Sequence, residues 1–291
     1  AGTPPRLRAK GQASLAALLK DLGYWEQSME LAEASLEASR ASGDAQTLAD
    51  ASHLKGLLLR EAGRFEEALP AFREALRLAQ QIPDRWGEAT TLNDIGIVYG
   101  LQHHNEPART YFLQSLELKR TIGDEQGVAY ALGNLAVVAE DDEEALRWLY
   151  ESLEIKRRLK DQQGIATGLT NVANRLVRLG QPREAWPLRL ESLLIFHRMG
   201  QVVPLAQVLA DCADTLLALQ LPAPALRVAA AVQRWSDERP VPLPLGSRRA
   251  LAESIERARS RLGPEAEALY QEALALSLEQ ACEAALEVQL A

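Results

Sequence analysis

The 291-residue sequence has few aromatic residues, two cysteines and no long apolar run. Aromatic residues make up only 5% of it, and β-branched residues are sparse beside Ala, Leu, Glu and Arg, which favours helices over strands. Cys212 and Cys282 match no metal-binding spacing, so we expect buried thiols in a reducing compartment. No segment offers the ~20 apolar residues of a membrane span. We therefore expect an all-α cytoplasmic protein without a membrane partner.

The charge balance and the first residues of the chain limit the possible functions further. The formal net charge is −8, whereas a wide nucleic-acid footprint needs a basic face, so we expect no direct nucleic-acid binding. Residues 1–8 carry no signal-peptide pattern, and a helical repeat begins almost at once. We interpret this as the cut end of a fragment of a longer protein.

Motifs for chemistry are also missing. The sequence contains no serine nucleophile elbow and no Gly-x-x-x-x-Gly-Lys-Ser/Thr phosphate loop. His103 and His104 are adjacent in an expected turn, where their side chains point apart. Residues 140–144 are acidic but lack the glycine and the ligand alternation of a calcium loop, so we interpret them as a helix start. We expect no catalytic residue, no metal, no cofactor and no enzyme activity.

A short junction recurs along the chain. Its second residue is separated from the next by 40, 40, 37 and 40 residues. Glycine reaches the left-handed conformation that ends a helix, and aspartate accepts hydrogen bonds from the first free amides of the next helix. The junctions are Gly43-Asp44, Pro83-Asp84, Gly123-Asp124, Lys160-Asp161 and Gly200-Gln201. Each junction therefore predicts the end of one helix and the start of another.

Two columns of small residues keep a fixed place between the junctions. Two helices joined by a tight turn approach closely only where the crossing residues are small. The first column is Ala16, Gly56, Gly96, Ala136, Ala173 and Ala213. The second column is Ser28, Ala68, Ala108, Ala145, Ala185 and Ala225. Together with flanking apolar residues at helical spacing, these columns predict one helix pair per repeat.

The repeats resemble the tetratricopeptide repeat family. The likeness rests on the paired small residues, a turn residue such as Gly63 or Gly180, and the blocks Gly63-Arg-Phe-Glu-Glu-Ala68 and Leu132-Gly-Asn-Leu-Ala136. The usual repeat has about 34 residues, whereas these repeats are longer, with an extended second helix and without the frequent final proline. The resemblance implies an all-α, right-handed α-solenoid of about six helix pairs. The alternative is an irregular helical bundle.

We expect three segments along the chain. A solenoid over residues 1–239 would hold repeats at about 6–43, 44–83, 84–123, 124–160, 161–200 and 201–239. Residues 240–246 are proline-rich and should form an extended connector. Residues 247–291 should cap the stack, with Ser247 starting a helix, Gly263-Pro264 ending it and a capping box from Ser277 to Gln280 starting the last one.

The tail carries a second resemblance. Ala225-Leu-Arg-Val-Ala-Ala-Ala231, Pro242-Leu-Pro and the segment from Arg261-Leu-Gly-Pro to Ala281 look like the C-terminal end of bacterial signal-transducing ATPase regulators of the LuxR type. In that group a long-repeat tetratricopeptide array follows an ATPase module. The resemblance implies that this chain is the sensor or interaction part of a transcriptional regulator.

The first helix of each pair should line the concave face of a solenoid. Residues that point away from the buried small residue then become candidate ligand contacts. These are Asn93, Asp94, Tyr130, Asn134, Asn171, Asn174 and Asp211. An amide can donate and accept at once, which suits the backbone of an extended peptide. The alternative is that Asn134 and Asn171 only tie neighbouring helices together.

Three function classes remain at this stage. The first is a non-catalytic protein- or peptide-binding module acting as the sensor domain of a regulator, whose partner could be another domain of the same polypeptide. The second is a free-standing scaffold or peptide receptor that binds short linear motifs in its groove. The third, an enzyme, lacks any supporting residue. Self-association is compatible with each.

Overall fold

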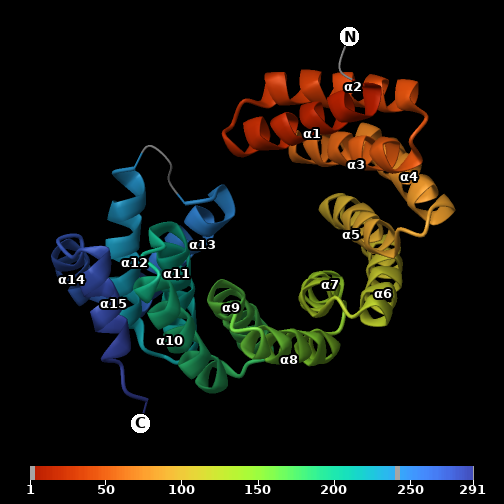
Figure 1. Ribbon diagram of the computed structural model, residues 1–291. Helices are drawn as coiled ribbons and strands as arrows, with labels where there is room; N and C mark the ends of the chain where they lie inside the picture. The colour runs from red at the N-terminus through yellow and green to blue at the C-terminus, as the bar shows by residue number, and fades with distance from the viewer. Residues whose placement is uncertain (1–3, 240–242, 291) are drawn as a thin grey trace. The chain divides into compact units, whose positions relative to one another are not determined.

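The computed structural model describes residues 4–239 and 243–290, which form helices in successive pairs (Figure 1). The first seven helices are α1 (Pro5–Asp21), α2 (Trp25–Ser42), α3 (Ala45–Glu61), α4 (Phe65–Gln81), α5 (Arg85–Leu101), α6 (Asn105–Ile122) and α7 (Glu125–Val138). The next five are α8 (Asp142–Arg158), α9 (Gln162–Arg178), α10 (Pro182–Arg198), α11 (Val202–Ala218) and α12 (Pro222–Asp237). The last are α13 (Leu245–Leu262), the 3₁₀ turn η1 (Gly263–Glu265), α14 (Ala266–Ala273) and α15 (Leu278–Leu286). The described residues contain no strand, which confirms the predicted all-α solenoid class.

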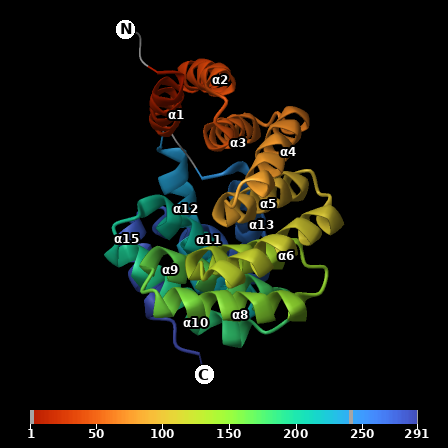
Figure 2. The ribbon, with the colours of Figure 1, turned by 45° about the vertical axis from the view of Figure 1, so that its right-hand side comes forward.

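The chain divides into two compact units. An N-terminal unit spans Ala1–Glu140 and a C-terminal unit spans Asp141–Ala291. In the N-terminal unit α1 packs on α2, α3 on α4 and α5 on α6, and Figures 1 and 2 show the helices of each pair side by side. In the C-terminal unit α9 packs on α10 and α11 on α12. The boundary falls in the shortened turn between α7 and α8, inside the fourth predicted repeat.

The predicted junction caps are present at four of five junctions. Each aspartate accepts a hydrogen bond from the backbone amide three residues later. The distances are 2.8 Å from Asp44 to Thr47, 2.9 Å from Asp84 to Gly87, 2.8 Å from Asp124 to Gly127 and 2.9 Å from Asp161 to Gly164. Gln201 precedes α11 without a side-chain cap, because its longer side chain does not fold back onto the amides as aspartate does.

The turns inside the pairs also follow the sequence pattern. Gly63 and Gly180 have φ values of 71° and 74°, and His103 occupies the matching turn with a φ of 60°. A left-handed residue at this place lets the chain reverse within three residues, and only glycine takes it without steric cost. His103 therefore lies in a turn, as predicted.

The two columns of small residues lie at the buried helix crossings. Every alanine and serine in both columns is 0–2% exposed. Gly56 and Gly96 face the rings of Phe72 and Phe112, and a Cβ added at either glycine would come within 2.7 Å of the ring. Both columns are therefore buried, as close approach of two helices requires.

Larger side chains at the crossings should therefore destabilise the protein. We expect Ala108→Leu and Ala185→Leu each to lower the free energy of unfolding by ~1–3 kcal/mol, because both alanines are 0% exposed and the added carbons overpack the crossing. Thermal melts followed by circular dichroism measure this. Unchanged midpoints in both variants would show that the register is wrong.

A column of buried serines, which the sequence analysis did not single out, joins the helices of several pairs. Ser35 Oγ donates to the carbonyl of Ala9 at 2.8 Å, Ser115 Oγ to that of Ala89 at 2.7 Å, and Ser192 Oγ to that of Ala166 at 2.9 Å. In each case the donor and the acceptor are 26 residues apart. These bonds fix the second helix along the first.

The C-terminal helices cover the end of the C-terminal unit. Helices α13, α14 and α15 pack on α12, and Cys212 and Cys282 lie buried in the shared apolar core. The predicted start of α13 at Ser247 is wrong: the helix begins at Leu245, with Pro244 at the N-cap position, because a proline has no backbone N–H to donate and therefore stands at the boundary of the helix. The predicted capping box from Ser277 to Gln280 is present and begins α15. Residues 240–242 of the predicted connector lie outside the described residues.

Candidate functional site

The C-terminal unit contains an open pocket of about 380 Å³ between α9 and α11. Its lining is mostly uncharged and polar, with amide and hydroxyl groups and a single carboxylate. The lining residues are Gln163, Thr167, Thr170, Asn171, Asn174, Phe196, Pro204, Gln207, Val208, Asp211 and Ser247. Three predicted site residues, Asn171, Asn174 and Asp211, therefore lie together.

Asn171 is the predicted contact that the structure leaves uncommitted. Its side chain is half-buried in the pocket wall and makes no hydrogen bond within the described part of the chain. A partly buried amide keeps its full capacity to donate and accept, which a ligand can satisfy. No hydrogen bond of Asn171 within the described residues links it to a neighbouring helix.

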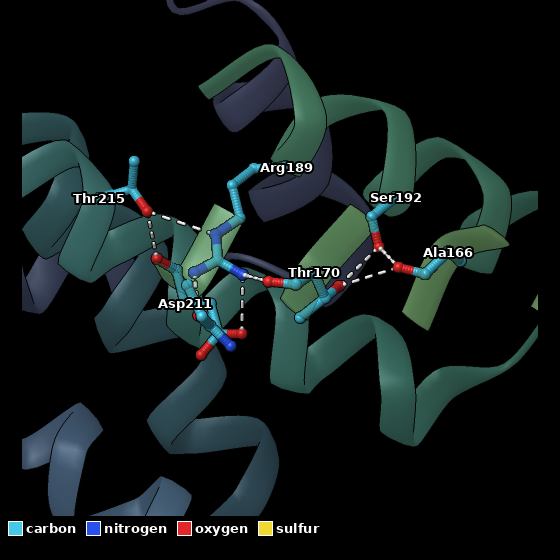
Figure 3. A network of polar contacts seen from close by, with 7 residues as sticks. Ala166, Thr170, Arg189, Ser192, Asp211 and Thr215 are labelled. Atoms are coloured by element: carbon cyan, nitrogen blue, oxygen red, sulfur yellow. Dashed lines mark hydrogen bonds and ion pairs between the residues drawn. The ribbon is translucent and has the colours of Figure 1, made fainter. Parts of the chain in front are cut away.

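A buried arginine forms hydrogen bonds with residues that line or adjoin the pocket. The Arg189 side chain on α10 is only 3% exposed. Its Nη1 donates to Asp211 Oδ2 at 3.0 Å and its Nε donates to Thr215 Oγ1 at 3.3 Å (Figure 3). Its Nη2 donates to Asn174 Oδ1. Nη1 also donates to the carbonyl of Thr170 at 3.3 Å. One guanidinium thus orients polar groups from both helices that flank the pocket.

Asp211 is held in an unfavourable electrostatic setting. Its side chain is 36% exposed, but desolvation by the surrounding helices raises the pKa of this carboxyl above its ordinary value. Arg189 acts in the opposite direction, and Asp214 adds to the rise in the pKa. The Arg189 guanidinium therefore compensates part of the desolvation cost of the pocket carboxylate.

The predicted site residues of the N-terminal unit have mostly structural partners. Asn134 Nδ2 on α7 donates to Asn93 Oδ1 on α5 at 2.9 Å. Asp94 is 7% exposed and bonds to His53 Nε2 at 2.8 Å and to Arg60 Nη1 at 2.6 Å. Tyr130 is 52% exposed. The contact between Asn134 and Asn93 joins α7 to α5, which matches the alternative that Asn134 ties neighbouring helices together.

Arg189 is not among the residues predicted from sequence, although the sequence carries a signal for it. Four residues after the small residue of the second helix, other repeats carry apolar side chains at Phe72, Phe112, Leu149 and Ala229. Arg189 stands in this buried column. A charged residue in an apolar column predicts a buried polar partner, because an isolated charge is too costly to bury.

Catalytic and metal-binding groups are not apparent in the described parts of the chain. Burial raises the pKa of the Cys212 thiol to about 12 and that of Cys282 to about 11, so neither is a thiolate nucleophile near neutral pH. Among the described residues no group of three or more His, Cys, Asp or Glu side chains is placed to hold a metal ion. In the same residues, no helix is long and apolar enough to cross a bilayer.

The helix pairs, capped junctions and small crossing residues define an α-solenoid of the tetratricopeptide type. The model of the tetratricopeptide repeat family matches residues 7–81 and 47–121. Residues 7–121 are therefore tetratricopeptide repeats. No curated protein sequence matches the chain at a significant level.

Solved structures share this fold over most of the chain. A signal transduction ATPase with numerous domains from Pyrococcus horikoshii, which has a tetratricopeptide repeat sensor, is 15% identical, with 91% of this chain and 42% of that chain covered and a TM-score of 0.72. The apo form of RapI is 17% identical, with 92% and 72% covered and a TM-score of 0.70. A Rap protein complexed with competence and sporulation factor is 14% identical, with 91% and 77% covered and a TM-score of 0.62. At these identities the likeness is one of fold.

Proposed function

We propose that the chain is a non-catalytic module that binds a peptide or protein segment in the pocket between α9 and α11. The uncommitted amide of Asn171 is the observation that carries the proposal. Around it lie hydroxyl and amide groups, together with a carboxylate whose position Arg189 fixes. Such a lining suits an extended backbone, which needs donors and acceptors in alternation. The Rap structure complexed with a factor supports the same use of the fold.

Asn171 and Asn134 form a matched pair for a test, because they occupy equivalent repeat positions but differ in their contacts. Peptides selected from a random display library against the wild-type chain serve as probes. We expect Asn171→Ala to weaken their binding about tenfold without changing the melting midpoint, because it leaves a buried group of the ligand unpaired. Calorimetric titration beside thermal melts measures both quantities.

The control variant should show the opposite behaviour. Asn134→Ala removes the hydrogen bond to Asn93, so we expect it to destabilise the fold by ~0.5–1.5 kcal/mol and to bind the same peptides normally once folded. Selected peptides that bind Asn171→Ala as tightly as wild type would remove this pocket from consideration.

Within this function we propose a role as the sensor part of a signal-transducing ATPase that regulates transcription in bacteria. The tail resemblance and the fold of the Pyrococcus horikoshii protein, of which this chain spans 42%, support the proposal. An ATPase module encoded in the same reading frame is the expected finding. A natural gene that encodes these repeats alone would favour the alternative, a free-standing peptide receptor.

A further inference from the structure

The N-terminal unit holds a second cavity, of about 290 Å³, between α3 and α5. Ala75 and Ala79 of α4 line it, so α4 contributes only small side chains to the cavity. Two carboxylates, Asp50 and Asp84, lie in its wall, and the 62% exposed indole of Trp86 lies beside them. The cavity therefore combines negative charge with an aromatic face.

The two carboxylates of this cavity share a hydrogen-bond donor from an uncharged side chain. Gln46 Nε2 donates to Asp50 Oδ1 at 3.0 Å and to Asp84 Oδ2 at 2.9 Å, which bridges the two acids through a neutral amide. Within the described residues neither acid forms an ion pair. His53 also lines the cavity, but its Nε2 bonds to Asp94 at 2.8 Å. The carboxylates of the wall are thus met by neutral donors within the described residues, including the Gly87 amide at the start of α5.

The other junction aspartates do have cations. Asp44 Oδ2 lies 3.2 Å from Arg6 Nε. Asp124 attracts the Lys119 amine and Asp161 attracts the Lys156 amine. Asp84 forms no ion pair within the described chain, and its two carboxylate oxygens accept from uncharged donors, the Gly87 amide and Gln46 Nε2.

Lys119 shows what fills the equivalent space one repeat later. It stands 40 residues after Ala79, as Asp124 stands 40 residues after Asp84 and Gly127 40 residues after Gly87. Lys119 is 6% exposed, and its Cδ would lie 2.8 Å from a Cβ added at Gly127. Burial lowers the pKa of the Lys119 amine, and the attraction of Asp124 opposes that effect. The lysine stem therefore lies over Gly127, with its charge near Asp124.

Lys156 repeats the arrangement in the C-terminal unit. It is 8% exposed, and its amine is attracted by Asp161. Its Cδ would lie 4.0 Å from a Cβ added at Gly168. Gly168 occupies the repeat position of Thr91, which lines the cavity between α3 and α5. Two repeats thus fill with their own lysine the place that Ala79 leaves open.

We propose that the cavity between α3 and α5 receives a lysine side chain from a partner peptide or protein, with its ammonium paired to Asp84 and Asp50. A lysine stem packs along small apolar residues while its head seeks the carboxylates, as in the two filled repeats. The Trp86 face adds a cation–π contact. This site uses no residue of the pocket between α9 and α11, so its test is separate from that of the proposed function.

The probe is lysine capped as Nα-acetyl lysine N-methylamide, titrated into the full chain. The readout is the indole N–H resonance of Trp86, assigned by means of Trp86→Phe. We expect a saturable shift, which Asp84→Asn weakens about tenfold by removing a charge-assisted hydrogen bond. The matched control Asp44→Asn changes the equivalent cap of α3 outside the cavity and should leave the shift intact. Absence of a saturable Trp86 shift in the wild-type chain would overturn the proposal, as would equal binding of the Nε-acetylated or arginine analogue.

Two variants test whether a lysine side chain of the chain itself fills the space: one adds a lysine at the open cavity, and the other removes the lysine from the equivalent filled space. Ala79→Lys should occupy the cavity with the chain's own amine and abolish the Trp86 shift. Lys119→Ala should open the equivalent space and give a lysine-dependent shift of the Gly127 amide that wild type lacks. If Ala79→Lys does not fold, Lys119→Ala still decides the matter. Undiminished probe binding to folded Ala79→Lys, or no new shift in Lys119→Ala, would contradict the inference.

Discussion

Replacing Arg189 by leucine is expected to lower the free energy of unfolding of the C-terminal unit by about 2–4 kcal/mol. The substitution leaves Asp211 without its cation and leaves Asn174 and Thr215 without a donor. The loss should fall below that of a fully buried pair, because the Asp211 side chain keeps 36% of its surface exposed. Leucine suits the helix, since the preceding repeat carries Leu149 at this position. Urea denaturation followed by circular dichroism measures the loss.

Two further variants isolate the cause. Arg189→Leu combined with Asp211→Asn should recover much of the stability, because the unpaired carboxylate is then gone. Arg157→Leu is the matched surface control: its ion pair with Glu191 is 3.0 Å long, but its side chain is 51% exposed, so a loss below about 1 kcal/mol is expected. Equal losses in Arg189→Leu and Arg157→Leu would mean that the Arg189 network contributes nothing special.

The regular part of the fold could be predicted from sequence because it depends on local chemistry. Asp44 and Asp124 cap helices through amides three residues away, and Gly63 turns the chain through its own φ angle. The two columns of small residues depend only on helices that are adjacent in sequence, since a bulky residue at Ala108 would block the approach of those two helices. The start of α13 was missed because Pro244 and Ser247 are competing start signals only three residues apart.

The site was predicted less completely, because its residues depend on neighbours from other repeats. Asn134 and Asn171 occupy the same column, yet Asn134 bonds to Asn93, 41 residues earlier, and Asn171 has no hydrogen-bond partner in the described part of the chain. A single column cannot show this difference. Arg189 lies on a second helix, outside the column searched for ligand contacts, and its role follows only once Asn174 and Asp211 are placed beside it.

Introducing leucine at Gly96 is expected to lower the free energy of unfolding of the N-terminal unit by ~3 kcal/mol, at the upper end of overpacking effects. A Cβ at Gly96 would lie 2.6 Å from Phe112 Cε1, and the nearest atoms all belong to the Phe112 ring. Phe112 is 2% exposed and has no room to withdraw. Gly133→Leu is the matched control, because Gly133 also lies inside a helix of this unit but has nothing within 4 Å of an added Cβ. Gly133→Leu should not destabilise, since leucine favours helix over glycine.

A double-mutant cycle with Phe112→Ala tests whether the ring is the cause. Phe112→Ala alone should cost ~3–5 kcal/mol, because it removes a buried ring and leaves a cavity. In Gly96→Leu with Phe112→Ala the large and the small residue exchange sides of one crossing, so the leucine enters the space that the ring vacates. The double variant should therefore lose less than the two single losses added together, by at least ~1 kcal/mol. Urea denaturation of all four proteins measures the coupling. Additive losses would mean that the α5–α6 crossing is not set by this pair, and that the glycine at position 96 serves the backbone instead.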